Sequence, residues 1–246
     1  MDENMIGNAK RPNLLEQLLW SVIRPKKLFE AVREKPMITL PILLIVISGI
    51  GAGIAGYKAV GAIDYSQLGN IPPQQAEAMK DMMSSPALAM LGGVSAAFGQ
   101  IFGNLAGLFI KALIMWGIIR MLGGKGDYLR SVSVVGLSWI PLFIRNCIQA
   151  VVGANVDINR ELAAMDLANF NFMNLLSSSF MNEGIVFIIW NIILLGIGYS
   201  IVFGVSRVKT IITAFLYWLV SFLLAVGWGW GALQFSQKMQ GMVPKQ

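Results

Sequence analysis

Five long apolar stretches dominate the chain, at residues 38–57, 95–122, 132–152, 184–205 and 211–233. A helix needs about 20 largely apolar residues to cross a bilayer. The strict alternation over ten residues that marks a transmembrane β-strand does not occur in the sequence. We therefore predict an all-α, polytopic membrane bundle of five transmembrane helices. Its membrane domain covers residues 36–233, between a polar tail at 1–13 and a C-terminal tail at 234–246.

A shorter amphipathic segment, residues 14–35, precedes the first span. Asn13 followed by Glu16 is typical of a helix that begins with a capping box, and Pro25 divides the segment into two helices. Apolar residues lie on one half of each helical wheel and charged residues on the other. We expect this pair to lie in the cytoplasmic membrane interface. The predicted membrane-surface residues are Trp20, Arg24, Lys26, Lys27 and Phe29. Docking of a cytoplasmic partner is the alternative role.

Glycine recurs at every fourth position of the second span, at Gly99, Gly103 and Gly107, and Lys111 continues the series. Steps of four residues advance a helix by roughly 400°, so these residues share one face. Small residues let helix backbones approach closely in a membrane. We predict that the three glycines form the packing seam of the bundle.

Composition supports a membrane protein and narrows its chemistry. Hydrophobic residues make up 56% of the chain and charged residues 13%, against roughly 25% charged in soluble domains. The chain has no histidine, and its single cysteine is Cys147. Disulfides, thiolate zinc sites and Ser–His–Asp or Cys–His catalysis are therefore excluded. No span contains Asp or Glu, which disfavours proton-coupled transport and aspartyl proteolysis. We predict a non-enzymatic protein without a cofactor.

Methionine is the one remaining candidate for metal binding. Met79, Met82 and Met83 fall in a predicted short helix of the loop after the first span. Thioether ligands suit copper, but three methionines on one helix face are typical of a plain apolar surface. We therefore predict no metal site.

Basic residues predict the orientation. One side holds the following residues: Lys10, Arg11, Arg24, Lys26, Lys27, Arg33, Lys35, Arg120, Lys125, Arg130, Arg207 and Lys209. The other side has Lys58, Lys80, Arg160, Lys238 and Lys245. By the positive-inside rule the N-terminus is cytoplasmic and the C-terminus extracytoplasmic. Topology therefore explains the net charge of +6, and we predict no nucleic-acid partner.

Lys111 and Arg145 are charges inside spans, where an ionised group costs about 3 kcal/mol. Counting residues from the span ends predicts a polar cluster in the outer half of the bundle, formed by Arg145, Asn104, Asn191, Asn146 and Gln100. Two roles stay open for these residues. In the first, the two charged groups hydrogen-bond to amides and carbonyls, including a carbonyl freed by Pro141, and have a structural role. In the second, Arg145 forms an anion site for a lipid phosphate or for a carboxylate of a partner protein.

Three stretches place proline, glycine and basic residues at the span boundaries. They are RPKKLFEAVREKPMITLPILL at 24–44, LGGKGDYLRSVSVVGLSWIP at 122–141 and WNIILLGIGYSIVFGVSRVKT at 190–210. The chain resembles the Yip1 domain family of five-span membrane proteins over about residues 14–233. In eukaryotes that family is associated with Golgi and vesicle trafficking and with Rab-type GTPases, through a longer N-terminal region with an acidic aromatic motif. This chain has only a short tail there. The resemblance therefore favours a bacterial plasma-membrane member and disfavours GTPase binding. Some such relatives appear alongside ABC-type exporters.

The leading functional hypothesis is an integral membrane scaffold or accessory subunit. It would assemble with other membrane proteins, for instance an ABC-type exporter or trafficking machinery, or with itself, and would contact membrane lipids. The alternative is a lipid or small-solute carrier that uses the anion site at Arg145. An ATP-binding motif and a coupling carboxylate are absent from the sequence, which disfavours transport by this chain alone.

Overall fold

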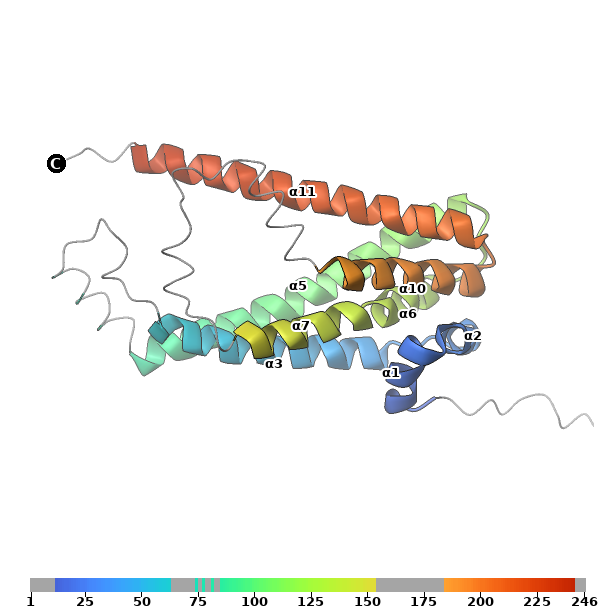
Figure 1. Ribbon diagram of the computed structural model, residues 1–246, viewed down its shortest axis with the longest axis horizontal. Coiled ribbons are helices and arrows are strands. Elements are labelled where there is room, and N and C mark those ends of the chain that lie inside the picture. Colours follow the sequence, from blue (N-terminus) through green and yellow to red (C-terminus); the bar gives the residue numbers. More distant parts are fainter. Residues whose placement is uncertain are drawn as a thin grey trace, which may run out of the picture. The chain divides into compact units, whose positions relative to one another are not determined.

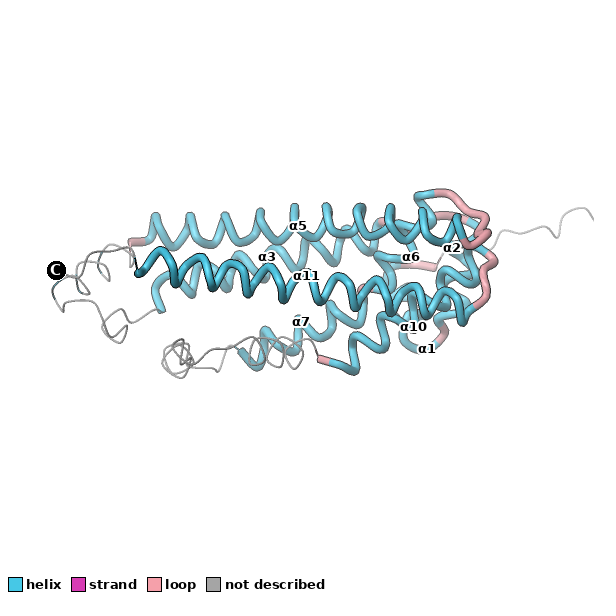
Figure 2. The backbone as a smooth tube through the Cα atoms, turned by 90° about the horizontal axis from the view of Figure 1, so that it is seen from above, coloured by secondary structure: helices cyan, strands magenta, loops and turns pink. Residues whose placement is uncertain are grey.

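The computed structural model describes residues 12–62, 85–153 and 184–241, together with 74, 77 and 81 (Figure 1). Every regular element among these residues is an α-helix, as Figure 2 shows. Five helical segments are long and apolar enough to cross a membrane: Thr39–Val60, Pro86–Met121, Tyr128–Ile148, Ile185–Phe203 and Arg207–Gly231. This confirms the predicted five-span helical class. Met79, Met82 and Met83 lie outside the described residues, as does most of the loop after the third span.

The two N-terminal helices form where the sequence predicts them. Helix α1 (Leu14–Ile23) begins with a capping box, because the Glu16 amide donates to the Asn13 side chain and the Asn13 amide donates to the Glu16 carboxylate, each at 2.8 Å. These bonds satisfy amides that have no partner within the helix. Helix α2 (Pro25–Glu34) follows at once. Proline fits its first position, since it has no amide hydrogen to lose there.

The spans are formed by α3 (Thr39–Ala62), α5 (Pro86–Met121), α10 (Ile185–Phe203), α11 (Arg207–Gly241) and, for the third span, by two helices in succession. These two are α6 (Tyr128–Ser138) and α7 (Ile140–Gly153). The helix breaks at Trp139 because Pro141 lacks the amide that would continue the hydrogen-bond ladder. Asp127 begins α6 by accepting the Arg130 amide at 2.8 Å. Arg130 in turn pairs with the Asp127 carboxylate.

The chain forms two compact units, and each takes pieces of the same long helices. The first contains Met1–Ile42, Leu108–Ile140 and Asn191–Ala214. The second contains Leu43–Gly107, Pro141–Trp190 and Phe215–Gln246. All the basic residues assigned by sequence to the cytoplasmic side belong to the first unit. The core of the first unit is centred on α6, whose residues from Ser131 to Ser138 are all buried.

Helices α3 and α5 pack closely in the second unit, but not through the predicted glycines. A Cβ on Gly93 would lie 2.8 Å from the Gly53 carbonyl oxygen, and a Cβ on Gly56 would lie 3.0 Å from the Gly92 carbonyl oxygen. By contrast, a Cβ at Gly99, Gly103 or Gly107 would meet nothing within 4 Å. The prediction that these three form the seam within the bundle is therefore wrong. Helix α5 begins at Pro86, nine residues before the predicted span, and this additional helical segment supplies Gly92 and Gly93.

Candidate functional site

Hydroxyl groups on α6 bind this helix to its neighbours in the first unit. The Ser131 hydroxyl donates to the Ala112 carbonyl of α5 at 2.8 Å and lies 2.6 Å from the Tyr199 hydroxyl of α10. The Ser133 hydroxyl accepts the Met37 amide, at the entry to α3, at 2.8 Å. All three side chains that carry these hydroxyls are fully buried. One helix therefore holds α3, α5 and α10 by polar contacts.

Glycines allow two further close contacts with α6. A Cβ on Gly136 would lie 2.5 Å from the Pro41 Cβ, so α6 and the start of α3 touch directly. On α10, a Cβ on Gly198 would lie 2.7 Å from Val134 and 2.9 Å from the Phe29 ring. The sequence analysis did not select the α6 residues. Ser131 and Ser133 are hydroxyl residues at the start of the third predicted span, and such residues are the signal that indicates polar contacts with neighbouring helices.

Helix α2 covers this core, which corrects one predicted membrane-surface residue. Leu28, Phe29 and Val32 are completely buried. Phe29 therefore contacts Gly198 of α10 and does not lie at the membrane surface, because the apolar face of α2 turns toward its own unit. Arg24, Lys26 and Lys27 are exposed, and their position at the membrane surface stays a prediction. Trp20 is half-buried, and the Lys27 ammonium lies 4.2 Å from the centre of its ring.

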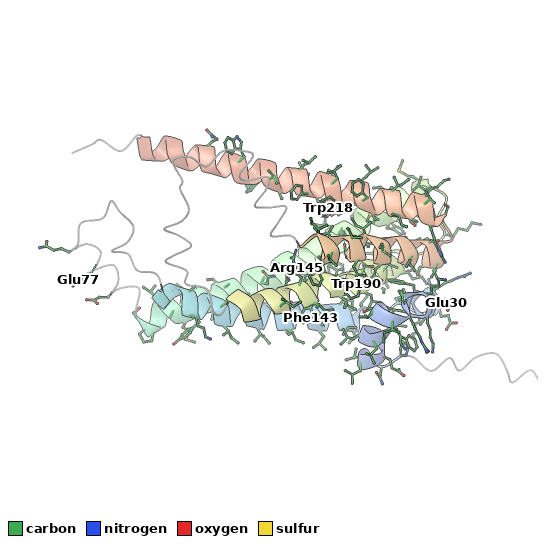
Figure 3. All side chains as sticks on the ribbon, in the orientation of Figure 1. Glu30, Glu77, Phe143, Arg145, Trp190 and Trp218 are labelled. Carbon is green, nitrogen blue, oxygen red and sulfur yellow. The ribbon has the colours of Figure 1, made fainter. Side chains whose placement is uncertain are left out.

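Arg145 lies on α7, where Figure 3 shows its side chain. Its Nε and Nη2 donate to the Asn146 side-chain oxygen at 3.3 and 3.0 Å. Its aliphatic portion lies beside Gly184, where a Cβ would be 3.2 Å from the Arg145 Cδ. Asn104 belongs to the same unit, and its buried Nδ2 has no hydrogen-bond acceptor among the described residues. Of the predicted cluster, Arg145 and Asn146 are thus in contact.

Asn191 has a different partner from the predicted one. It belongs to the first unit, is 5% exposed and donates from Nδ2 to the Ser138 carbonyl. That carbonyl lies at the break between α6 and α7, where proline interrupts the helical ladder. Lys111 also belongs to the first unit. The six polar residues predicted inside the spans are therefore divided between the two units: Asn191 and Lys111 belong to the first, and Arg145, Asn104, Asn146 and Gln100 belong to the second. The anion site at Arg145 stays a prediction.

We expect Asn191→Leu to destabilise the fold by about 1–2 kcal/mol. Leucine conserves the volume of the side chain but leaves the buried Ser138 carbonyl without its donor. The free energy of unfolding, measured by titration with sodium dodecyl sulfate, tests this. Asn104→Leu is the matched control, since it removes an amide group without an acceptor among the described residues, and we expect a loss below about 0.5 kcal/mol. Equal losses in both variants would contradict the role of Asn191.

Helix α5 also has a second face of small residues that is exposed in the described part of the chain. Gly99, Gly103 and Gly107 are all exposed on it. Phe102 beside them is 62% exposed and stacks on Phe98 with ring centres 5.8 Å apart. We call the three glycines with Phe98 and Phe102 the α5 glycine face. In the described part of the chain, no group of three His, Cys, Asp or Glu residues is placed to hold a metal ion.

The five apolar helices and the buried polar contacts between them define a multi-pass helical membrane protein. Residues 20–229 match the family model of the Yip1 domain, so the chain belongs to the Yip1 domain family. It is 26% identical over 208 residues to membrane protein YknW of Bacillus subtilis (strain 168), covering 84% of this chain and 87% of that protein. This confirms the resemblance to a bacterial-type member. No solved structure matches the chain.

Proposed function

We propose that this protein is a non-enzymatic scaffold or accessory subunit that assembles with other integral membrane proteins. The observation that supports this most strongly is the α5 glycine face, which is exposed although the same helix already packs on α3 through Gly92 and Gly93. Helix α5 thus has one glycine face that contacts α3 and a second that stays exposed among the described residues.

The free energy of helix formation argues for an external partner at this face. Each glycine within a helix costs about 1 kcal/mol relative to alanine. Apolar surface alone does not drive helices together in lipid, since the acyl chains are equally apolar, and close contact depends on small residues that let backbones approach. A face of three glycines is shaped to receive a helix, and the Phe98–Phe102 pair beside it adds apolar contact area.

The proposed location is the plasma membrane, with the N-terminus in the cytoplasm and the C-terminus outside. The distribution of basic residues supports this, because the predicted cytoplasmic ones all belong to the first unit. An anionic inner leaflet attracts such residues by about 1 kcal/mol each. The family resemblance favours an ABC-type exporter or another membrane transport machinery as the partner.

Purification of the tagged chain from its own host in a mild detergent tests the proposal, with mass spectrometry of the proteins that remain bound. We expect a second integral membrane protein in a fixed ratio to the chain. We further expect Gly103→Leu to lower its recovery at least tenfold while the variant itself stays folded, because the new side chain extends into the proposed interface and meets nothing in its own chain. Recovery of the wild-type chain without a protein partner would contradict the proposal.

A further inference from the structure

Helix α1 has an unusual orientation, with its apolar residues on the outside. Leu15, Leu19 and Ile23 are 70%, 57% and 69% exposed, whereas Gln17 and Ser21 are buried. Water would disfavour such an outer face, but the acyl region of a bilayer accepts it. The Trp20–Lys27 contact supports the same placement, since tryptophan and lysine favour the headgroup level. Helix α1 therefore fits a position just below the lipid headgroups.

A groove of about 590 Å³ opens where α1 meets α2. Arg24, Lys26 and Lys27 line it, with Glu30 as its one acidic residue. Figure 3 shows Glu30 on α2. The apolar part of the lining comes from Ile23, Pro25 and Ile197. Three cations against one carboxylate make the groove electropositive.

The lining of this groove combines two kinds of chemistry. Arg24, Lys26 and Lys27 are exposed and supply charged donors that suit phosphate oxygens. Ile197 belongs to α10, one of the membrane spans, and Ile23 is the last residue of the lipid-oriented face of α1. A ligand that matches both kinds of lining carries a negative charge and a hydrocarbon portion.

We propose that this groove binds an anionic glycerophospholipid, with the phosphate held by Arg24, Lys26 and Lys27 and the glycerol and upper acyl chains against Ile23 and Ile197. The charge of the groove argues for an anionic rather than a zwitterionic lipid, and the exposed apolar face of α1 argues for a lipid rather than a free phosphate. The site uses α1, α2 and α10 and no residue of the α5 glycine face, so it does not depend on the scaffold proposal.

Native mass spectrometry of the purified full chain tests the site, with phosphatidylglycerol and phosphatidylcholine of identical acyl chains added in turn. We expect one phosphatidylglycerol per chain to bind at least tenfold more tightly than phosphatidylcholine. Lys26→Gln with Lys27→Gln should weaken that binding about 30-fold, since each basic residue near a membrane surface contributes about fivefold. Lys26→Arg with Lys27→Arg should retain it.

Two further variants separate the groove from general charge. Arg207→Gln with Lys209→Gln removes the same charge at exposed positions of the same unit that do not line the groove, and we expect less than a threefold change. Ile197→Trp fills the groove without changing its charge and should weaken binding at least tenfold. Equal losses in the two glutamine variants, unchanged binding in Ile197→Trp, or displacement of the lipid by millimolar glycerol phosphate would each overturn the proposal.

Discussion

Phe29→Ala is expected to lower the free energy of unfolding by about 3–5 kcal/mol, as for other buried aromatic residues. The Phe29 side chain is completely buried, and its ring lies where a Cβ on Gly198 would be 2.9 Å away. Truncation leaves a cavity between α2 and α10, because Gly198 has no side chain that could fill the space. Titration with sodium dodecyl sulfate, followed by tryptophan fluorescence, measures the loss.

Leu19→Ala is the matched control for Phe29→Ala. Leu19 is a large apolar residue of the neighbouring helix but is 57% exposed. We expect its truncation to cost below about 0.5 kcal/mol, because it leaves no cavity within the protein. A small effect of Phe29→Ala, or an equal effect of both variants, would show that α2 lies on the membrane surface and does not cover the core.

Gly93→Leu is expected to cost about 3 kcal/mol or more, or to prevent recovery of folded protein. The nearest atom to a Cβ at this position is the Gly53 carbonyl oxygen, at 2.8 Å, and backbone does not move aside as a flexible side chain does. The new side chain therefore separates α3 from α5. The measurements are the yield of monodisperse protein in size-exclusion chromatography and the free energy of unfolding.

Gly103→Leu makes the same change ten residues along the same helix and serves as the control. A Cβ there meets nothing within 4 Å, and leucine favours a helix over glycine by roughly 1 kcal/mol. We expect unchanged or slightly raised stability. If Gly103→Leu is as damaging as Gly93→Leu, the predicted glycine seam lies within the bundle after all.

The sequence predicts the existence of the five spans and the starts of the two N-terminal helices well, because these depend on local properties. Span length and apolarity depend on neighbouring residues alone, and so do the Asn13 capping box and the start of α2 at Pro25. The break at Trp139 was not predicted, although Pro141 is visible in the sequence. Proline is often tolerated in membrane helices, and whether it ends a helix depends on contacts from other helices.

The site was predicted less well, since helical periodicity shows which residues share a face but not what that face touches. Gly99, Gly103 and Gly107 do share a face, yet it is exposed, and Gly92 and Gly93 make the contact instead. Depth counting placed Asn191 with Arg145, but it donates to the Ser138 carbonyl at the end of α6. The burial of Phe29 likewise depends on Gly198, about 170 positions away in the sequence.

Photocrosslinking in living cells tests the scaffold proposal most directly. Benzoylphenylalanine replaces Phe102 with a similar aromatic residue beside the glycine face, and the same residue at Leu224 of α11, which is 70% exposed, is the control. We expect a covalent adduct with a different integral membrane protein from position 102 and none of that protein from position 224. Adducts with lipid alone, or with a second copy of the chain alone, would contradict the proposal that this protein assembles with other membrane proteins through α5.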